Sequence, residues 1–482
     1  MNAASSWISR NVARLRPAAG DKAAAAPASP PERNTHERLQ ATLRRAGEAL
    51  PPRALRRLLD DLQAVAAERV SEVEAGRHAQ AVADWYAQAK PEERRDLWLL
   101  ICEQFVPDAA QVKAAQQRYE QAAGTEEAPQ AEAHLRRALL SGRTRLLQRF
   151  AVFPEGLRFL VNLRAELLPR LRGDKRLVPL DAELGQLFST WFDVAFLELR
   201  RLSWDSPASL LEKLIKYEAV HDIKSWADLK NRLDSDRRCY GFFHPRMPDE
   251  PLIFVEVALV GEISSSITPL LDETAAPADL KRATTAIFYS ISSTQPGLRG
   301  VSFGDSLIKH VAETLTGEFP RLRTFATLSP IPGFRAWLAK HGAERIDRMG
   351  DKERAELGRA LPEAPAEPQI ADVLAAADQA LELAPKSPVA QFLLRAAACY
   401  LGRELDKSGR PLDPVARFHL GNGARVERLN WAGDPSAKGM KQSFGLMVNY
   451  LYDTKRLDRH RTLLAQGRIP VSAEVEGLAR QP

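Results

Sequence analysis

Apolar and polar positions divide the chain into a helical first part and a mixed second part. From residue 37 to 170, leucines recur at helical spacing, as in Leu55, Leu58, Leu59 and Leu62. This part has no strand-like run and no cluster of titratable residues, so we expect a helical bundle used for packing and self-association. The helices expected after the one that begins near Pro91 cover 108–123, 130–149, 154–170 and 181–201.

Strand-like runs enter only after about residue 200. They are short, apolar and rich in β-branched and aromatic side chains, which is typical of strands in an antiparallel or mixed sheet. The first predicted strands cover 239–244, 252–260, 286–293 and 324–328. Residues 335–405 return to helical spacing. The later predicted strands cover 416–420, 425–429 and 446–451, and a loop with a short tail is expected after about 455.

Local composition predicts three segments. Residues 1–36 are rich in Ala, Ser and Pro, which is typical of a disordered segment. The charged run from Arg172 to Arg176 is typical of a connector. The sequence therefore predicts a helical domain at 37–180 and a mixed-sheet domain at 181–482, and the fold class is α+β.

Residues 282–334 combine a strand, a loop with glycines, a helix that begins at about Asp305, and a second strand. Glycines let the backbone approach an anion, and the first N–H groups of a helix have no partner within it. A diphosphate fits such a loop, whereas an ordinary strand-to-helix turn explains the local pattern equally well. The candidate binding residues are Arg299, Gly300, Val301, Ser302, Phe303, Gly304 and Asp305.

Charge and cysteine content narrow the class of protein. The net charge of +6 is mild for 482 residues, and the basic and acidic residues are interleaved, so nucleic acid is not an expected partner. A membrane-spanning helix needs about 20 apolar residues, and no stretch approaches that length. The three cysteines are far apart, which argues against a disulfide scaffold or a structural zinc site and favours a reducing compartment.

Several motifs resemble known families. The loop Arg299–Gly304 resembles the coenzyme A diphosphate loop of the GNAT acyltransferases, although Ser302 stands where that family has glycine. The runs FYSIS-TQ-GL-GV, LIK, LSPIPGF, FHL-NGA and GLM-NY, between about Ser203 and Tyr452, resemble malonyl-CoA decarboxylases in content and order.

The resemblance implies a GNAT-like mixed-sheet catalytic domain that follows an all-helical bundle. It also implies decarboxylation of malonyl-CoA to acetyl-CoA and CO2 without a cofactor, and assembly into a dimer or tetramer through the helical domain. Ser329 and His419 fall on the catalytic serine and histidine of that family, and both are expected to contact the substrate. Tyr450 and Tyr452 match late aromatic positions that either line the acyl pocket or serve packing.

Local signals place these residues at the ends of strands. Ser329 follows the strand at 324–328, beside the expected thioester, and Pro330 restricts its backbone. Asn422-Gly423 is typical of a hairpin turn, so His419 is expected near the end of a strand. A turn hydroxyl and a structural histidine are the alternative interpretations of the two residues.

Two other functions stay open at this point. One is a GNAT-type acyltransferase that moves an acyl group from coenzyme A to an amine, and the other is an inactive coenzyme A sensor. The Ala- and Arg-rich composition favours a bacterial, cytoplasmic protein. The basic, acid-free residues 1–20 also fit a mitochondrial transit peptide, which would place the protein in the matrix.

Overall fold

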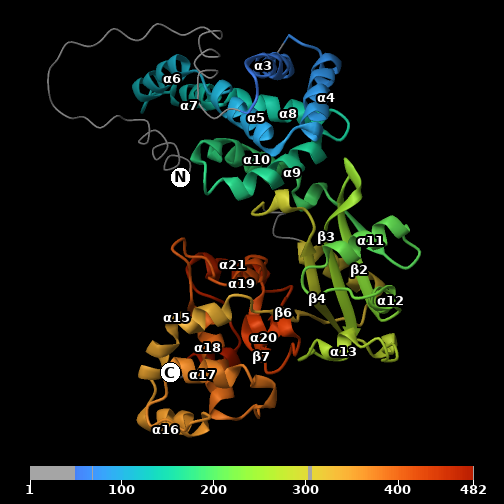
Figure 1. Cartoon of the computed structure of the whole chain (residues 1–482), viewed down its shortest axis with the longest axis vertical. Coiled ribbons are helices and arrows are strands. Elements are labelled where there is room, and N and C mark those ends of the chain that lie inside the picture. Colours follow the sequence, from blue (N-terminus) through green and yellow to red (C-terminus); the bar gives the residue numbers. More distant parts are fainter. Residues whose placement is uncertain (1–48, 68, 302–306, 481–482) are drawn as a thin grey trace, which may run out of the picture.

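The computed structural model describes residues 49–480, except for residue 68 and residues 302–306. Helices α3 to α10 come first and gather at one end of the molecule (Figure 1). Their bounds are Pro52–Ala66 for α3, Glu72–Gln88 for α4, Pro91–Gln104 for α5, Ala109–Gln121 for α6, Ala128–Leu139 for α7, Gly142–Val152 for α8, Gly156–Leu167 for α9 and Val178–Trp191 for α10. The prediction of a helical first part is confirmed.

Two helix predictions in this part were wrong in their bounds. Residues 130–149 form two helices, because the Ser141 hydroxyl accepts a hydrogen bond from the Thr144 N–H and starts a new helix at Gly142. The helix expected at 181–201 ends at Trp191. Strand β1 (Glu198–Leu202) then pairs antiparallel with β2 (Arg237–His244) at the edge of the sheet.

The strands form one mixed sheet in the order β1-β2-β3-β4-β5-β8-β6, with β7 paired to β8. The remaining bounds are Met247–Val260 for β3, Thr285–Ser293 for β4, Thr324–Thr327 for β5, Ser329–Pro330 for β6, Arg425–Asn430 for β7 and Met447–Leu451 for β8. Among the described strands, only β4 and β5 pair in parallel. The predicted α+β fold class is confirmed.

The parallel pair is short, and its two strands then separate. Their paired residues run from Thr285 with Thr324 to Phe288 with Thr327, and the Leu328 N–H donates to the Phe288 carbonyl at 3.0 Å. Strand β4 continues to Ser293 on its other partner β3, whereas the chain after β5 turns to pair with β8. The backbone of β4 beyond Phe288 therefore faces the cavity described below.

The late part of the chain holds two further corrections. Residues 416–420 lie in helix α19 (Pro414–Gly421), not in a strand, because Asp413 caps its first N–H groups and Pro414 occupies its first position. Gly423 does adopt a positive φ of 86°, but it follows a helix and does not join two strands. The tail contains α21 (Leu457–Ala465) and α22 (Ala473–Arg480), where only a loop was expected.

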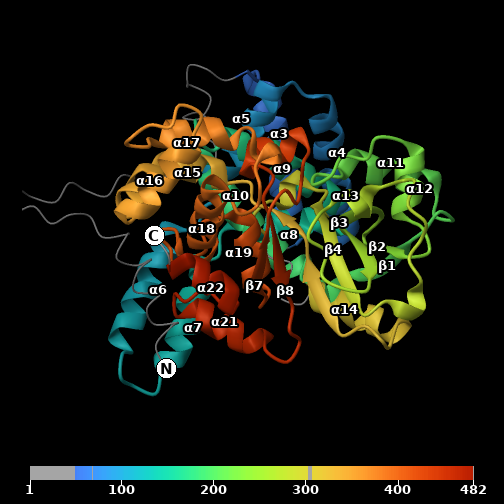
Figure 2. The same ribbon diagram turned by 90° about the horizontal axis from the view of Figure 1, so that it is seen from below.

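The other helices cover the sheet and its loops. Figure 2 shows β7 and β8 between α18 on one side and β3 and β4 on the other. The bounds are Ala208–Tyr217 for α11, Trp226–Arg232 for α12, Thr268–Leu271 for α13, Leu307–Glu318 for α14, Phe334–Asp347 for α15, Asp351–Ala360 for α16, Ile370–Ala377 for α17, Pro388–Arg403 for α18 and Ala437–Ser443 for α20. No helix of the described residues is long and apolar enough to cross a membrane.

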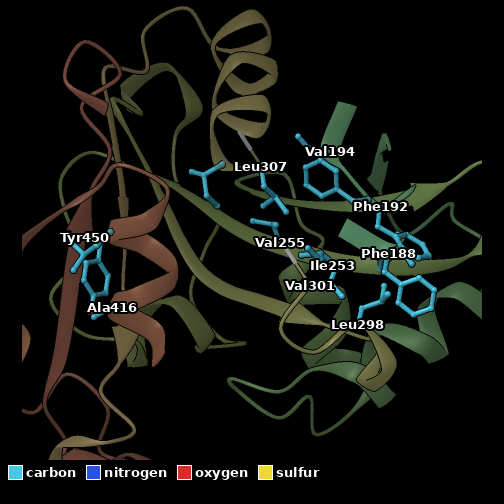
Figure 3. Close-up of a cluster of buried hydrophobic side chains, with 14 of the residues drawn as sticks. Phe188, Phe192, Val194, Ile253, Val255, Leu298, Val301, Leu307, Ala416 and Tyr450 are labelled. Atoms are coloured by element: carbon cyan, nitrogen blue, oxygen red, sulfur yellow. The ribbon is translucent and has the colours of Figure 1, made fainter. Parts of the chain in front are cut away.

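One cluster of buried apolar side chains connects the helical first part to the sheet. Figure 3 shows Phe188 and Phe192 of the α10 region facing Leu298 and Val301 of the loop after β4. Burial of apolar surface is the main stabilising contribution to folding. The helical part and the loop therefore stabilise each other through a shared core.

Candidate active site

A cavity of about 850 Å³ opens where β4 and β5 separate. Its walls come from β4, the 3-10 turn Pro296–Leu298 with the loop after it, β6 and helix α19. Five predicted site residues line it: Arg299, Gly300, Val301, Ser329 and His419. The other loop candidates, Ser302, Phe303, Gly304 and Asp305, lie outside the described residues.

Ser329 lies at the first position of β6, where the sheet turns from β5 toward β8. Its hydroxyl is buried and donates to the Thr327 Oγ1 at 2.8 Å. The same Thr327 oxygen accepts from the Tyr450 N–H at 3.2 Å. Contacts from two strands therefore position the Ser329 side chain, and its oxygen also lies within hydrogen-bond distance of His419.

His419 comes from helix α19, on the opposite wall. Its Nε2 lies 3.2 Å from the Ser329 Oγ, and its Nδ1 lies 2.8 Å from the Tyr452 hydroxyl. The Tyr450 ring stacks on the imidazole with a centroid distance of 4.6 Å. Sequence-distant segments thus bring the predicted serine and histidine together, and both predicted tyrosines hold the histidine. Neither tyrosine lines the cavity.

Burial sets the protonation of this group. The pKa of His419 is lowered from 6.5 to about 3, because the ring is removed from water. The pKa of Tyr452 is raised well above its ordinary value, also by burial, so its hydroxyl keeps its proton. At neutral pH the pair is therefore a neutral imidazole and a neutral phenol.

The hydrogen bonds assign one tautomer to that neutral imidazole. Because the Ser329 hydroxyl donates to Thr327, its oxygen is free to accept from an N–H on Nε2 of His419. Nδ1 then accepts from the Tyr452 hydroxyl. The proton of His419 consequently lies on the nitrogen that faces Ser329 and the cavity.

Asp413 connects helix α19 to the segment that follows β6. Its Oδ1 accepts from the N–H groups of Val415 and Ala416 at 2.9 and 3.0 Å, which caps helix α19. Its Oδ2 accepts from the Gly333 N–H and the Tyr400 hydroxyl, both at 3.3 Å. Burial raises the pKa of this carboxyl. Sequence reasoning missed Asp413, although Asp before Pro at a helix start was the signal for it.

A third wall was also missed. Ala219 and Val220 line the cavity, and Glu218 accepts from the N–H groups of Val220 and His221 at 2.8 Å. The Glu218 carboxylate also accepts from the Ser290 hydroxyl at 2.8 Å, which ties this wall to β4. No periodic pattern in the sequence connects residue 218 with residue 290.

The loop at 296–301 forms the remaining side of the cavity. Gly300 has a φ of +77°, which favours glycine, and a Cβ added there would meet open space. Val301 is buried, and helix α14 buries Leu307, Ile308 and Val311. In the described residues, no group of three or more His, Cys, Asp or Glu side chains is placed to hold a metal ion.

A mixed sheet with separating parallel strands, a loop leading to a helix, and a buried serine and histidine together define a GNAT-like catalytic domain behind a helical bundle. The family model for the malonyl-CoA decarboxylase C-terminal domain matches residues 195–482, and that for the N-terminal domain matches residues 105–192. The chain belongs to the malonyl-CoA decarboxylase family.

Individual relatives agree with this assignment. The chain is 40% identical over 336 residues to the mitochondrial malonyl-CoA decarboxylase of Rattus norvegicus, covering 67% of this chain and 68% of that protein. It is 39% identical over 339 residues to that of Anser anser anser, covering 67% and 66%. The match thus spans about two thirds of these relatives.

Solved structures match over more of the chain. The malonyl-CoA decarboxylase structure from Rhodopseudomonas palustris has a TM-score of 0.74 at 38% identity, covering 88% of this chain and 99% of that one. The one from Cupriavidus metallidurans has a TM-score of 0.71 at 45% identity, covering 88% and 100%.

Proposed function

We propose that this chain decarboxylates malonyl-CoA to acetyl-CoA and CO2. The observation that carries the proposal is the buried Ser329–His419 pair, 3.2 Å apart, in a cavity bounded by a glycine-bearing loop. The family assignment supports the same substrate and reaction.

Coenzyme A has a defined place in this proposal. The diphosphate binds at the loop that contains Arg299, Gly300 and Val301. The Gly300 N–H and the Arg299 guanidinium bind it there, whereas the N–H groups of Arg299 and Val301 already donate to the Pro296 and Leu298 carbonyls. The pantetheine arm lies between the separating strands β4 and β5, and its amides hydrogen bond to the backbone of β4 beyond Phe288. The malonyl thioester then reaches Ser329 and His419.

The substrate carboxylate is oriented by a neutral group. The Ser329 hydroxyl turns from Thr327 to donate to a carboxylate oxygen. A cation that binds the carboxylate alone would stabilise the charged ground state more than the transition state, in which the charge moves from the carboxylate to the enolate. A protonated His419 lies near both positions of that charge, because it is the group that protonates the enolate. Orientation matters because the breaking C–C bond must align with the π system of the thioester carbonyl.

The reaction moves one electron pair and one proton. The C–C bond breaks, CO2 departs, and the electron pair delocalises into the thioester as an enolate. The α-carbon of the enolate takes a proton from Nε2 of His419, which recovers one from solvent. Before that step, the negative malonyl carboxylate favours the protonated imidazole, and the Tyr452 hydroxyl accepts from Nδ1–H in that state.

No metal or organic cofactor is required in this proposal, because the thioester itself delocalises the charge. The test is to incubate the purified chain with malonyl-CoA and no acceptor, and to measure acetyl-CoA and CO2. We expect equal amounts of both. No release of CO2 without an added amine, together with acyl transfer when the amine is present, would favour the acyltransferase alternative.

We also propose that the chain self-associates through its helical part, as a dimer or tetramer. Large apolar side chains are exposed there, among them Val73, Leu140 and Val152. Sedimentation of the full chain tests this, and a monomer at all concentrations contradicts it. A cytoplasmic location stays a prediction, since both bacterial and mitochondrial proteins are among the relatives.

A further inference from the structure

One arginine of the helical part holds the loop on which coenzyme A is proposed to bind. Arg164, on α9, is 6% exposed. Its Nη1 donates to the Gly297 carbonyl at 2.7 Å and to the Arg299 carbonyl at 3.1 Å. Its Nε donates to Asp181 of α10 at 2.8 Å. The guanidinium therefore joins two helices to the loop.

The loop lies directly against the same helix. A Cβ added to Gly297 would lie 1.9 Å from the Val161 carbonyl oxygen, so only glycine allows this approach. Leu298 and Val301 are buried on the side of the loop that faces Phe188 (Figure 3). The loop consequently has no freedom to move toward α9, and Arg164 limits its freedom to move away.

The hydrogen bond to Arg299 also determines the direction of a peptide group. In a trans peptide unit, the N–H points opposite to the carbonyl. Because the Arg299 carbonyl points at Arg164, the N–H of Gly300 points away from α9. Gly300 lines the cavity, and an N–H in this place is the kind of donor that binds a diphosphate oxygen.

We propose that Arg164 is a positioning residue for the coenzyme A diphosphate, acting through the peptide group between Arg299 and Gly300. This inference rests on the proposed function, because it uses the same loop as the diphosphate site. It gives the helical part a role in substrate binding as well as in packing. Arg164 itself does not contact the substrate.

The experiment compares Arg164→Met with a matched control, Arg143→Met. Arg143 is 7% exposed and also pairs with a carboxylate, Glu183, and with a backbone carbonyl, that of Cys102. It lies in the same helical part but does not contact the loop. Both variants remove a buried guanidinium, so a general loss of stability affects both.

We expect Arg164→Met to raise the KM for malonyl-CoA by about tenfold, the effect of losing one or two charge-assisted hydrogen bonds, with kcat changed less than about twofold. The Kd of acetyl-CoA should rise by the same factor. Malonyl-pantetheine lacks the diphosphate, so its KM should not change. Arg164→Lys should give an intermediate KM, and Arg143→Met should leave all of these constants unchanged.

Unchanged affinity for acetyl-CoA in folded Arg164→Met would overturn the inference. An equal rise of KM for malonyl-CoA and malonyl-pantetheine would also overturn it, because the effect would not pass through the diphosphate. If the Met variant does not fold, native constants in Arg164→Lys would overturn it as well. Failure of the native chain to decarboxylate malonyl-CoA would sink the proposed function instead, while the acetyl-CoA affinities still test Arg164.

Discussion

The protonation of His419 should depend on the charge of the bound acyl group. In the free protein, burial lowers its pKa to about 3, so the imidazole is neutral at pH 6 to 7. The proposed mechanism needs a proton on this ring beyond the one on the neutral form. We therefore predict that the protein takes up a proton at His419 when it binds a ligand whose acyl end is negatively charged, and that it takes up none there when it binds acetyl-CoA.

The magnitude follows from the geometry of the site. A pKa lowered from 6.5 to about 3 corresponds to about 5 kcal/mol that opposes charging the ring. An anion that accepts from the Ser329 hydroxyl can approach Nε2 of His419 to about 4 Å, because the Ser329 Oγ itself lies 3.2 Å from that nitrogen. At that distance, with an effective dielectric constant of 20, the attraction is about 4 kcal/mol and offsets most of the opposing free energy.

The assay is isothermal titration calorimetry in buffers of different ionisation enthalpy, which gives the number of protons taken up. Sulfoacetyl-CoA carries a permanent negative charge in place of the carboxylate and cannot lose CO2. We expect its uptake to be about half a proton at pH 6, larger below that pH, and smaller as the pH rises toward 8. The phosphates are common to both ligands, so the difference from acetyl-CoA reports the acyl end alone.

His419→Gln is the control, because it keeps a hydrogen-bonding side chain that does not titrate. This variant should take up the same number of protons when it binds sulfoacetyl-CoA as when it binds acetyl-CoA. Equal uptake by the two ligands in the native protein would refute the reasoning and leave His419 neutral throughout the reaction.

Three other predictions test the site and the loop. Ser329→Ala and His419→Gln should each lower kcat by about 10²–10⁴-fold with little change in acetyl-CoA affinity, and steady-state kinetics showing near-native kcat would exclude the residue from the reaction. Gly297→Ala should raise the KM for malonyl-CoA and lower the free energy of unfolding by about 1–3 kcal/mol, because the added Cβ meets the Val161 carbonyl; native values of both would contradict this contact. As the pH falls from 6.5 to 3, the free energy of unfolding of the native protein should decrease by about 1.4 kcal/mol per pH unit more than that of His419→Gln, since the unfolded histidine binds a proton that the folded one does not. If urea unfolding shows the same decrease in both proteins between pH 7 and 5, His419 is not a buried neutral imidazole.

The central sheet and the serine could be predicted from the sequence because their signals are local. The strand at 286–293 and the one at 324–328 are short runs rich in apolar, β-branched and aromatic residues, and Ser329 follows the second directly. The structure keeps this order, with β4 and β5 in parallel. The contribution of β1 was missed because its residues, Glu198–Leu202, are mostly polar and lie at the edge of the sheet.

The surroundings of His419 were predicted less well, because two local signals conflict. Ala416, Phe418 and Leu420 alternate with polar residues as in a strand, whereas Asp413-Pro414 begins a helix. The helix forms because the Asp413 carboxylate also binds Gly333, which is distant in sequence. Likewise, α21 is held by a contact that no local pattern reveals, between His460 Nδ1 and the Gly423 carbonyl at 2.9 Å.

The close approach of Gly297 to Val161 limits how this architecture can change by mutation. A backbone-to-backbone fit leaves no side chain at the contact that can be exchanged for another. A shift of α9 along its axis must be matched by a shift of the loop on which the substrate is proposed to bind. The helical part is therefore not an interchangeable module, and exchanging it between distant relatives should yield active chimeras only when the loop comes from the same parent.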